Sequence, residues 1–217
     1  MLNIHTSLAL FLILTPCQQN AQSRQEVSIR PDLTRSGNIA QWDFDGSGSW
    51  QIDAGRLILS KAGTPSGPIR RPAALAILKM KPVQQVSIEA EIHTTAPPDV
   101  ARRDLDVIVG YESPTRFYYV HLAAVSDNVH NGIFLVNNAD RVRIDSGTAK
   151  PQLTDFSWRR VRVERDGKSG RIAVYMDRSA APVLQATDTT ITRGRAGLGS
   201  FDDTGEFRNI VVKGYSH

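Results

Sequence analysis

The chain has 217 residues, enough for one domain of sandwich or barrel size. Its only cysteine is Cys17, which excludes an intrachain disulfide and zinc sites built from cysteine and histidine. The 26 basic and 22 acidic residues give a net charge of +4, and the arginine pairs are spread along the chain instead of forming one block. A nucleic-acid-binding protein is therefore not expected, whereas this mildly basic, mixed surface is compatible with acidic glycans or with the cell envelope.

An apolar block lies near the start of the chain, in a segment without charged side chains. The block, Leu8 to Leu14, is shorter than the roughly 20 apolar residues that a bilayer-spanning helix needs, so no transmembrane segment is expected. It predicts the core of a secretory signal peptide over residues 1–21, and hence a secreted or periplasmic protein. The run LTPC ends at Cys17 and resembles a bacterial lipoprotein box, so an outer-membrane lipoprotein anchored through Cys17 is the alternative.

Residues 22–41 are polar and predict a tether or a first edge segment, and a sandwich domain is expected over residues 42–217. From Trp42 onward, runs of about five to eight residues alternate between apolar and polar side chains, as strands with one buried face do. The clearest runs are 86–93, 104–111, 141–145, 158–165 and 171–177. Turn residues at 53–55 and at 166–170 predict two hairpins. The apolar segment 73–80 lies between two prolines and predicts a buried strand.

These strand signals recur without helical crossovers, which favours an all-β, two-sheet antiparallel jelly-roll sandwich. In such a sheet one face of each strand packs inward and the other meets water. In the run 86–93 the inward set is predicted to be Val86, Ile88, Ala90 and Ile92. The outward set is then Ser87, Glu89, Glu91 and His93.

Two segments resemble the concanavalin A-like lectin/glucanase superfamily. The run WDFDGSGSWQIDAGRLIL, which begins at Trp42, is similar to the hairpin that opens such sandwiches. The run GRAGLGSFDDTGEFRNIVVKG, which begins at Gly194, is similar to the strands that close them. The nearest named relatives that the motifs suggest are laminin-G-like modules and the 3-keto-disaccharide hydrolase domain.

The resemblance implies a concave sheet that engages carbohydrate, with some relatives hydrolysing glycans and others only binding them. It also implies a structural calcium ion at the place where the two ends of the chain meet in the sandwich. The family-sixteen glucanases carry an E-x-D-x-E or E-x-D-x-x-E strand, which this chain lacks. Its nearest approach to that strand is Glu89-Ala90-Glu91.

The hairpin formed by residues 104–123 carries the main candidate site. Its strand pairing has two possible registers, because a one-residue bulge reverses which side chains share a face. In one register Tyr119 and His121 lie beside Asp104 and Asp106 on the outer face, where an imidazole next to carboxylates can bind a sugar hydroxyl or act in acid–base catalysis. In the other register His121 points inward and is a hydrogen-bonded core histidine.

Further candidates flank this hairpin. His130 and Asn131 lie in the loop 124–132 and are predicted either to form a turn or to bind sugar hydroxyls. Glu89, Glu91 and His93 are predicted to form a solvated strand face or, alternatively, a pair of carboxyl groups suited to glycoside chemistry. Tyr111 and Arg141 complete the predicted sugar-binding set.

Acidic residues gather at both ends of the predicted sandwich. They are Asp43, Asp45, Asp202 and Asp203. Calcium takes six to eight oxygen ligands, which such loops supply, so the residues predict either a calcium site or plain turns.

The function expected from these patterns is carbohydrate binding on the concave sheet, without turnover. The first alternative is a glycoside hydrolase that uses His121 or His93 as the acid–base residue. Its partner is then Asp104, Asp106, Glu89 or Glu91. The second is an envelope domain that binds another protein through the same surface.

Overall fold

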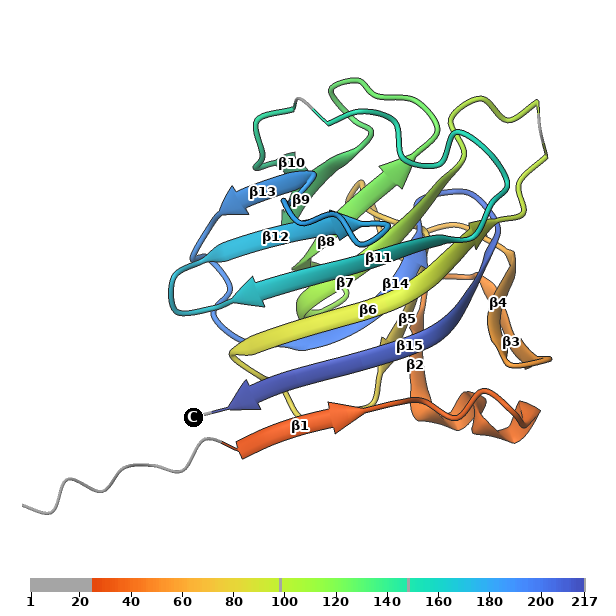
Figure 1. Ribbon diagram of the computed structural model, residues 1–217, viewed down its shortest axis with the longest axis horizontal. Coiled ribbons are helices and arrows are strands. Elements are labelled where there is room, and N and C mark those ends of the chain that lie inside the picture. The colour runs from red at the N-terminus through yellow and green to blue at the C-terminus, as the bar shows by residue number, and fades with distance from the viewer. Residues whose placement is uncertain (1–24, 98, 148, 217) are drawn as a thin grey trace, which may run out of the picture.

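The computed structural model describes residues 25–97, 99–147 and 149–216 of this chain (Figure 1). The predicted signal peptide and Cys17 lie outside these residues. The described part forms two antiparallel β-sheets stacked face to face, together with a short 3-10 helix, η1 (Ser36–Gln41). The predicted all-β sandwich is therefore confirmed. No helix in the described part is long and apolar enough to cross a bilayer.

The first sheet has eight strands. They are β1 (Gln25–Ile29), β3 (Ser49–Asp53), β4 (Arg56–Lys61), β6 (Gln85–Thr94), β11 (Arg159–Asp166), β12 (Arg171–Met176), β13 (Leu184–Thr187) and β15 (Gly205–Ser216). Their order is β13-β12-β11-β6-β15-β4-β3, and β1 pairs with the C-terminal part of β15. Figure 1 shows this sheet in front of the other.

The second sheet has seven strands. They are β2 (Trp42–Asp45), β5 (Ala74–Leu78), β7 (Asp104–Ser113), β8 (Arg116–Ala123), β9 (Gly132–Asn137), β10 (Val142–Arg143) and β14 (Arg195–Ser200). Their order is β10-β9-β8-β7-β14-β5-β2, so β10 and β2 are its two edges. The predicted strand 141–145 is wrong in extent, because β10 ends at Arg143. Beyond that residue, the side chain of Asp145 accepts hydrogen bonds from Nε of Arg143 and from the backbone N–H of Ile133.

The apolar core between the sheets follows the predicted alternation. In β6 the inward residues Val86, Ile88, Ala90 and Ile92 are buried, as predicted. The facing sheet supplies Leu105, Val107 and Val109 from β7 and Tyr118, Val120 and Leu122 from β8. Removing these side chains from water is the main driving force of folding, at about 25 cal/mol per Å² of apolar surface.

The outer face of the seven-stranded sheet is also buried, against the expectation that it meets water. A second apolar cluster covers it, consisting of Leu75, Ile77, Ile108, Tyr111, Phe117, Tyr119, Phe134 and Val136. Residues 62–73, which connect β4 to β5 and which we call the strap, cross this face, and Ile69 of the strap packs on the cluster. The seven-stranded sheet therefore has packed side chains on both faces.

The strap is fastened at both edges of the sheet. Near β2, the backbone N–H of Ser47 donates to the carbonyl of Thr64 at 3.1 Å. Near β10, the N–H of Arg70 donates to Asp140 at 2.8 Å, and the N–H of Arg141 donates to the carbonyl of Arg70 at 3.1 Å. Since β2 and β10 are opposite edges, the strap spans the whole sheet.

Gly46 permits the close approach of the strap to the turn after β2. It has a φ of +87°, and a Cβ atom there would lie 1.8 Å from the carbonyl oxygen of Ala73. We expect Gly46→Ala to lower the free energy of unfolding by about 2 kcal/mol, because the left-handed backbone and the clash both oppose the side chain. Urea unfolding followed by circular dichroism measures this loss.

Gly37 in η1 provides the matched control for that measurement. A Cβ atom there meets nothing within 4 Å. Gly37→Ala is expected to leave the unfolding midpoint nearly unchanged, and an equal loss in both variants would contradict the role given to Gly46.

Candidate functional sites

The register of the β7–β8 hairpin is the first of the two predicted ones. Asp106 pairs with His121, and Ile108 pairs with Tyr119. These side chains share the outer face of the seven-stranded sheet. A bulge between Val109 and Ser113, where Gly110 has a φ of +64°, resets the pairing toward the turn. His121 is nevertheless buried, at 1% exposure, because the outer face is itself covered.

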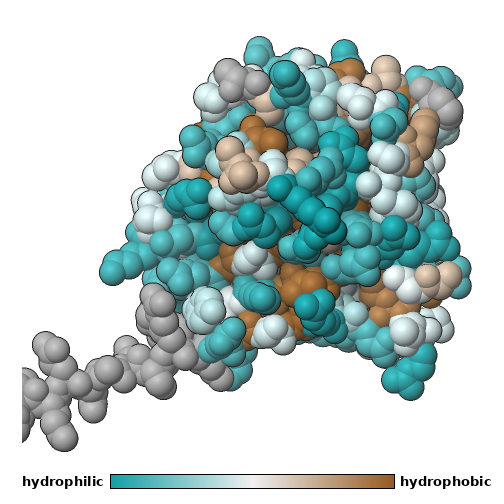
Figure 2. Space-filling model, viewed as in Figure 1, coloured by the Kyte–Doolittle hydropathy of each residue, from teal (hydrophilic) through white to brown (hydrophobic). Residues whose placement is uncertain are grey.

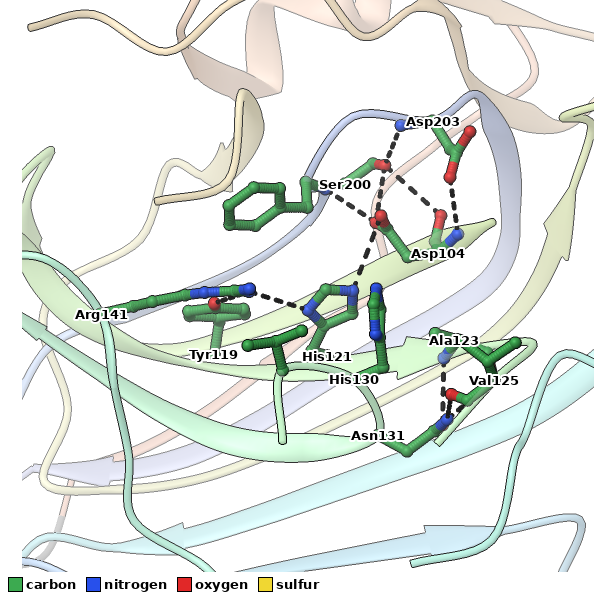
Figure 3. Close-up of polar contacts among 12 residues, drawn as sticks. Asp104, Tyr119, His121, Ala123, Val125, His130, Asn131, Arg141, Ser200 and Asp203 are labelled. Carbon is green, nitrogen blue, oxygen red and sulfur yellow. Dashed lines mark hydrogen bonds and ion pairs between the residues drawn. The ribbon is translucent and has the colours of Figure 1, made fainter. Parts of the chain in front are cut away.

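Arg141 fixes the orientation and the tautomer of His121 (Figure 3). Its Nη1 donates to the hydroxyl of Tyr119 at 2.8 Å and lies 3.1 Å from Nδ1 of His121. An arginine only donates, so Nδ1 accepts and the neutral imidazole carries its proton on Nε2. That Nε2 lies 3.6 Å from a carboxylate oxygen of Asp104. Burial lowers the pKa of His121, and the nearby charge of Arg141 adds to this, while Asp104 opposes it.

Asp104 ties the start of β7 to the loop after β14. Its carboxylate accepts a hydrogen bond from the hydroxyl of Ser200 at 2.9 Å and one from the N–H of Phe201 at 2.7 Å. Its own N–H donates to the carboxylate of Asp203 at 2.9 Å. Burial alone would raise the pKa of Asp104, but His121 and the N–H of Phe201 more than offset it and hold the pKa below its usual value.

The other carboxyl groups around Asp104 have raised pKa values, so their charged forms are destabilised. Asp106 is fully buried, and neither of its carboxyl oxygens has a hydrogen-bond partner among the described residues. Burial and the neighbouring Asp104 raise the pKa of Asp106 well above its usual value. The same two causes raise the pKa of Asp202 to about 7 and that of Asp203 to about 6. We call Asp104, Asp106, Asp202 and Asp203 the carboxylate cluster.

The carboxylate cluster and His121 have the ligand types and spacing of a metal site. The ligand atoms of Asp104, Asp106 and His121 lie within 4.8 Å of one another, and so do those of Asp104, Asp202 and Asp203. Carboxylate oxygens suit calcium, magnesium or manganese. The proton on Nε2 of His121 points at Asp104, so in this arrangement the carboxylates are the available ligands. A cation would also satisfy the unpaired oxygens of Asp106.

The structure does not bring the two predicted acidic segments together. Asp43 pairs with Arg195 at 2.5 Å and with Lys79 at 3.6 Å. Asp45 pairs with Arg71 of the strap at 2.8 Å. Because β5 and β14 separate β2 from the carboxylate cluster, Asp43 and Asp45 are neutralised locally and do not join Asp202 and Asp203. Asp43 and Asp45 thus lie apart from the other two predicted metal ligands, and each has a basic partner of its own.

Four of the eight predicted sugar-binding residues lie beneath the strap or in structural turns. Tyr111 and Tyr119 are buried in the cluster that Ile69 covers. The side chain of Asn131 is buried and bonds the backbone N–H and carbonyl of Ala123, each at 3.0 Å, so it closes its own loop. His130 is bound to Asp127 at 2.8 Å in the same turn. These four residues and His121 are each less than a tenth exposed.

The outer face of the eight-stranded sheet, which we call the open face, is exposed and hollowed. Figure 2 views it directly and shows mostly hydrophilic residues with apolar patches between them. Arg160 lines three of its hollows, of about 690, 310 and 330 Å³. Glu89 is shared by the first and second, and Glu91 by the first and third. The hollows therefore form one continuous depression around Arg160.

Ion pairs order the side chains of the open face. Glu89 pairs with Arg160, and Glu91 with Arg208 at 2.7 Å. His93 lies 3.5 Å from Glu206. The predicted row of Glu89, Glu91 and His93 thus does share one face, and cross-strand arginines neutralise both glutamates.

Two aromatic rings of the open face are already engaged. The ring of His93 stacks on Trp158 at 5.0 Å, and the guanidinium of Arg208 lies 4.0 Å from the centre of the Trp158 ring. The guanidinium of Arg162 lies 3.9 Å from the ring of Tyr175. The sequence pointed to neither contact, since Trp158 and Arg208 are far apart along the chain.

Several proteins of known structure share this architecture. The chain is similar to carbohydrate-binding module CBM66 from Bacillus subtilis, with a TM-score of 0.57, 15% identity and coverage of 78% of this chain and 93% of that one. It has the concanavalin A-like lectin/glucanase fold. A lectin from Bauhinia forficata in complex with GalNAc gives a TM-score of 0.58, 14% identity and coverage of 88% and 99%.

A third structure of this fold matches equally well. Lectin I from Ulex europaeus, in complex with the methyl glycoside of α-L-fucose, gives a TM-score of 0.56, 14% identity and coverage of 89% and 98%. No family model and no curated protein match the sequence. At these identities the comparisons establish the fold alone.

Proposed function

We propose that this chain is a carbohydrate-binding domain that takes its glycan on the open face. Proteins with the same fold include a carbohydrate-binding module and lectins in complex with sugars. The observation that carries the proposal is the continuous depression around Arg160. The outer face of the opposite sheet, which carries His121 and Tyr119, is covered by the strap.

The depression suits a chain of sugars better than a single one. It extends from β15, which carries Lys213, to Arg178 in the turn after β12. Three strand spacings separate β15 from β12, which is about 14 Å at roughly 4.8 Å each. The paired side chains of Glu89 and Arg160 offer acceptors and donors to sugar hydroxyls. Because each holds the other in place, little rotamer freedom remains to be lost on binding.

Arg160→Gln tests this assignment. We expect retention of polysaccharides by the purified domain to weaken about tenfold, since a hydrogen bond to a charged group contributes about 1.5–3 kcal/mol and the glutamine keeps part of the polarity. Affinity electrophoresis on a panel of soluble polysaccharides measures the change.

Arg116→Gln is the matched control. Arg116 is also partly exposed and also pairs with a glutamate, Glu112 at 2.5 Å, but on the other sheet. Its substitution is expected to leave glycan retention unchanged. The proposal fails if no polysaccharide is retained, or if both substitutions weaken retention equally.

We further propose that the carboxylate cluster binds a structural divalent cation. The supporting observation is Asp106, whose two buried carboxyl oxygens lack any donor among the described residues. Burying an unpaired carboxylate is costly, so such a group is either neutral or bound to a cation. A cation held by Asp104 and Asp106 would satisfy these oxygens, and one held by Asp104, Asp202 and Asp203 would fasten the loop after β14 to the start of β7.

A further inference from the structure

Each carboxylate that lines the depression on the open face forms an ion pair with an arginine. Glu89 pairs with Arg160, and Glu91 with Arg208. Asp177 binds Nε of Arg159 at 2.6 Å. Asp32, at the rim of the largest hollow, accepts hydrogen bonds from Thr34 and lies 4.0 Å from Arg35.

Three cations in the same depression have no such partner. Arg30 and Lys213 line the largest hollow, and Arg178 lines both smaller ones. Within the described ranges, none of these three side chains makes an ion pair or a side-chain hydrogen bond. The acidic groups are thus neutralised while a cation remains available at each end, so the depression is complementary to an anion.

The two aromatic rings that line the depression, Trp158 and Tyr175, are not free for stacking. Neutral sugars are commonly held by stacking on an exposed ring, but His93 and Arg208 already contact the ring of Trp158. Arg162 covers Tyr175 in the same way. Single-stranded nucleic acids depend on such platforms as well, at about 1–3 kcal/mol per stacked base. The open face therefore favours a ligand recognised through charge and hydrogen bonds.

We propose that the glycan of the open face is acidic, with carboxylate groups of uronic acid type. This inference rests on the proposed carbohydrate-binding function. Arg178 would bind a carboxylate at one end of the depression through its planar guanidinium, whose geometry matches a carboxylate in a bidentate fashion. Lys213, with Arg30, would bind a second carboxylate at the other end, and the sugars between would pass over Arg160.

The test compares two polymers that differ only in charge. Polygalacturonate and its carboxyl-reduced form are titrated calorimetrically into the domain at low and at high salt. We expect the acidic polymer to bind at least about tenfold more tightly at low salt and to lose this advantage as salt screens the charges. The double variant Arg178→Gln/Lys213→Gln is expected to weaken binding of polygalacturonate by about tenfold or more.

Controls separate this effect from damage to the fold and from unspecific charge. Arg102→Gln removes an exposed arginine from a loop outside the depression and is expected to leave binding unchanged. The thermal midpoint of the double variant is expected to equal that of the parent, because neither side chain has a partner in the described part of the fold.

Each contrary outcome has a distinct meaning. Equal binding of both polymers, unaffected by the double variant, would overturn the acidic specificity while carbohydrate binding stands. Failure to bind either polymer or any neutral polysaccharide would remove the proposed function and this inference with it. Binding of a single-stranded oligonucleotide as tightly as polygalacturonate would overturn the inference in favour of nucleic acid.

Discussion

Arg71→Ala is expected to lower the free energy of unfolding by about 3–5 kcal/mol, the range for removing one partner of a buried ion pair. Arg71 is part of the strap, and its fully buried guanidinium pairs with Asp45 at 2.8 Å. It also donates to the hydroxyl of Ser66 at 2.6 Å and to the carbonyl of Pro72 at 3.2 Å. Alanine would leave the largely buried carboxylate of Asp45 without its cation and release the strap near β2.

The neighbouring Arg70 supplies the control. Its side chain is exposed, and its main contribution to the strap is a backbone hydrogen bond to Asp140, which alanine retains. Urea unfolding should show little change for Arg70→Ala. Adding Asp45→Asn to Arg71→Ala should recover part of the loss, because the uncompensated charge is then removed. Equal effects of Arg70→Ala and Arg71→Ala would contradict the role of the ion pair.

Addition of Ca²⁺ or Mn²⁺ to metal-free protein is expected to raise its stability by about 2.7 kcal/mol at a free concentration of about 100 times Kd. The expected ligands are the carboxylates around Asp104, and a bound cation would satisfy the unpaired oxygens of Asp106. Differential scanning calorimetry before and after treatment with EDTA measures the shift.

Asp106→Asn makes this prediction specific to the carboxylate cluster. The substitution keeps the shape of the side chain and removes its charge, so the cation-dependent shift should disappear. Asp53→Asn, at an exposed aspartate of the β3–β4 hairpin, should retain the shift in full. If no cation stabilises the parent and Asp106→Asn is more stable than the parent at neutral pH, Asp106 is a buried neutral acid and the metal proposal is wrong.

The alternation of apolar and polar residues is a local property of the sequence. It therefore predicted which side chains of each strand are buried between the two sheets. In β6 and β11 the side chains point as the pattern indicates, and the buried strand at 73–80 is confirmed as β5. The hairpin at 53–55 is confirmed as well, where Ala54 and Gly55 both adopt positive φ. The register of the β7–β8 hairpin was not decidable, because it depends on the bulge at Gly110.

The parts that sequence reasoning missed are those set by partners far along the chain. The strap is rich in glycine and proline and has no periodic pattern, so nothing in its sequence indicates that it covers a sheet. Its burial of Arg71 runs against the usual exposure of arginine. Likewise Asp43 is of a residue type that often binds calcium, but its charge is balanced by Arg195, which lies 152 positions away.

The two ends of the strap have a consequence for how the molecule fluctuates. Edge strands usually fray first, since they lose few hydrogen bonds when they detach. Here the outermost strands β2 and β10 are joined by one connection that is anchored at Ser47 on one side and at Asp140 on the other. We therefore expect that detaching either margin strains the anchor of the other, so that the two borders open together, at a higher cost than isolated edge strands.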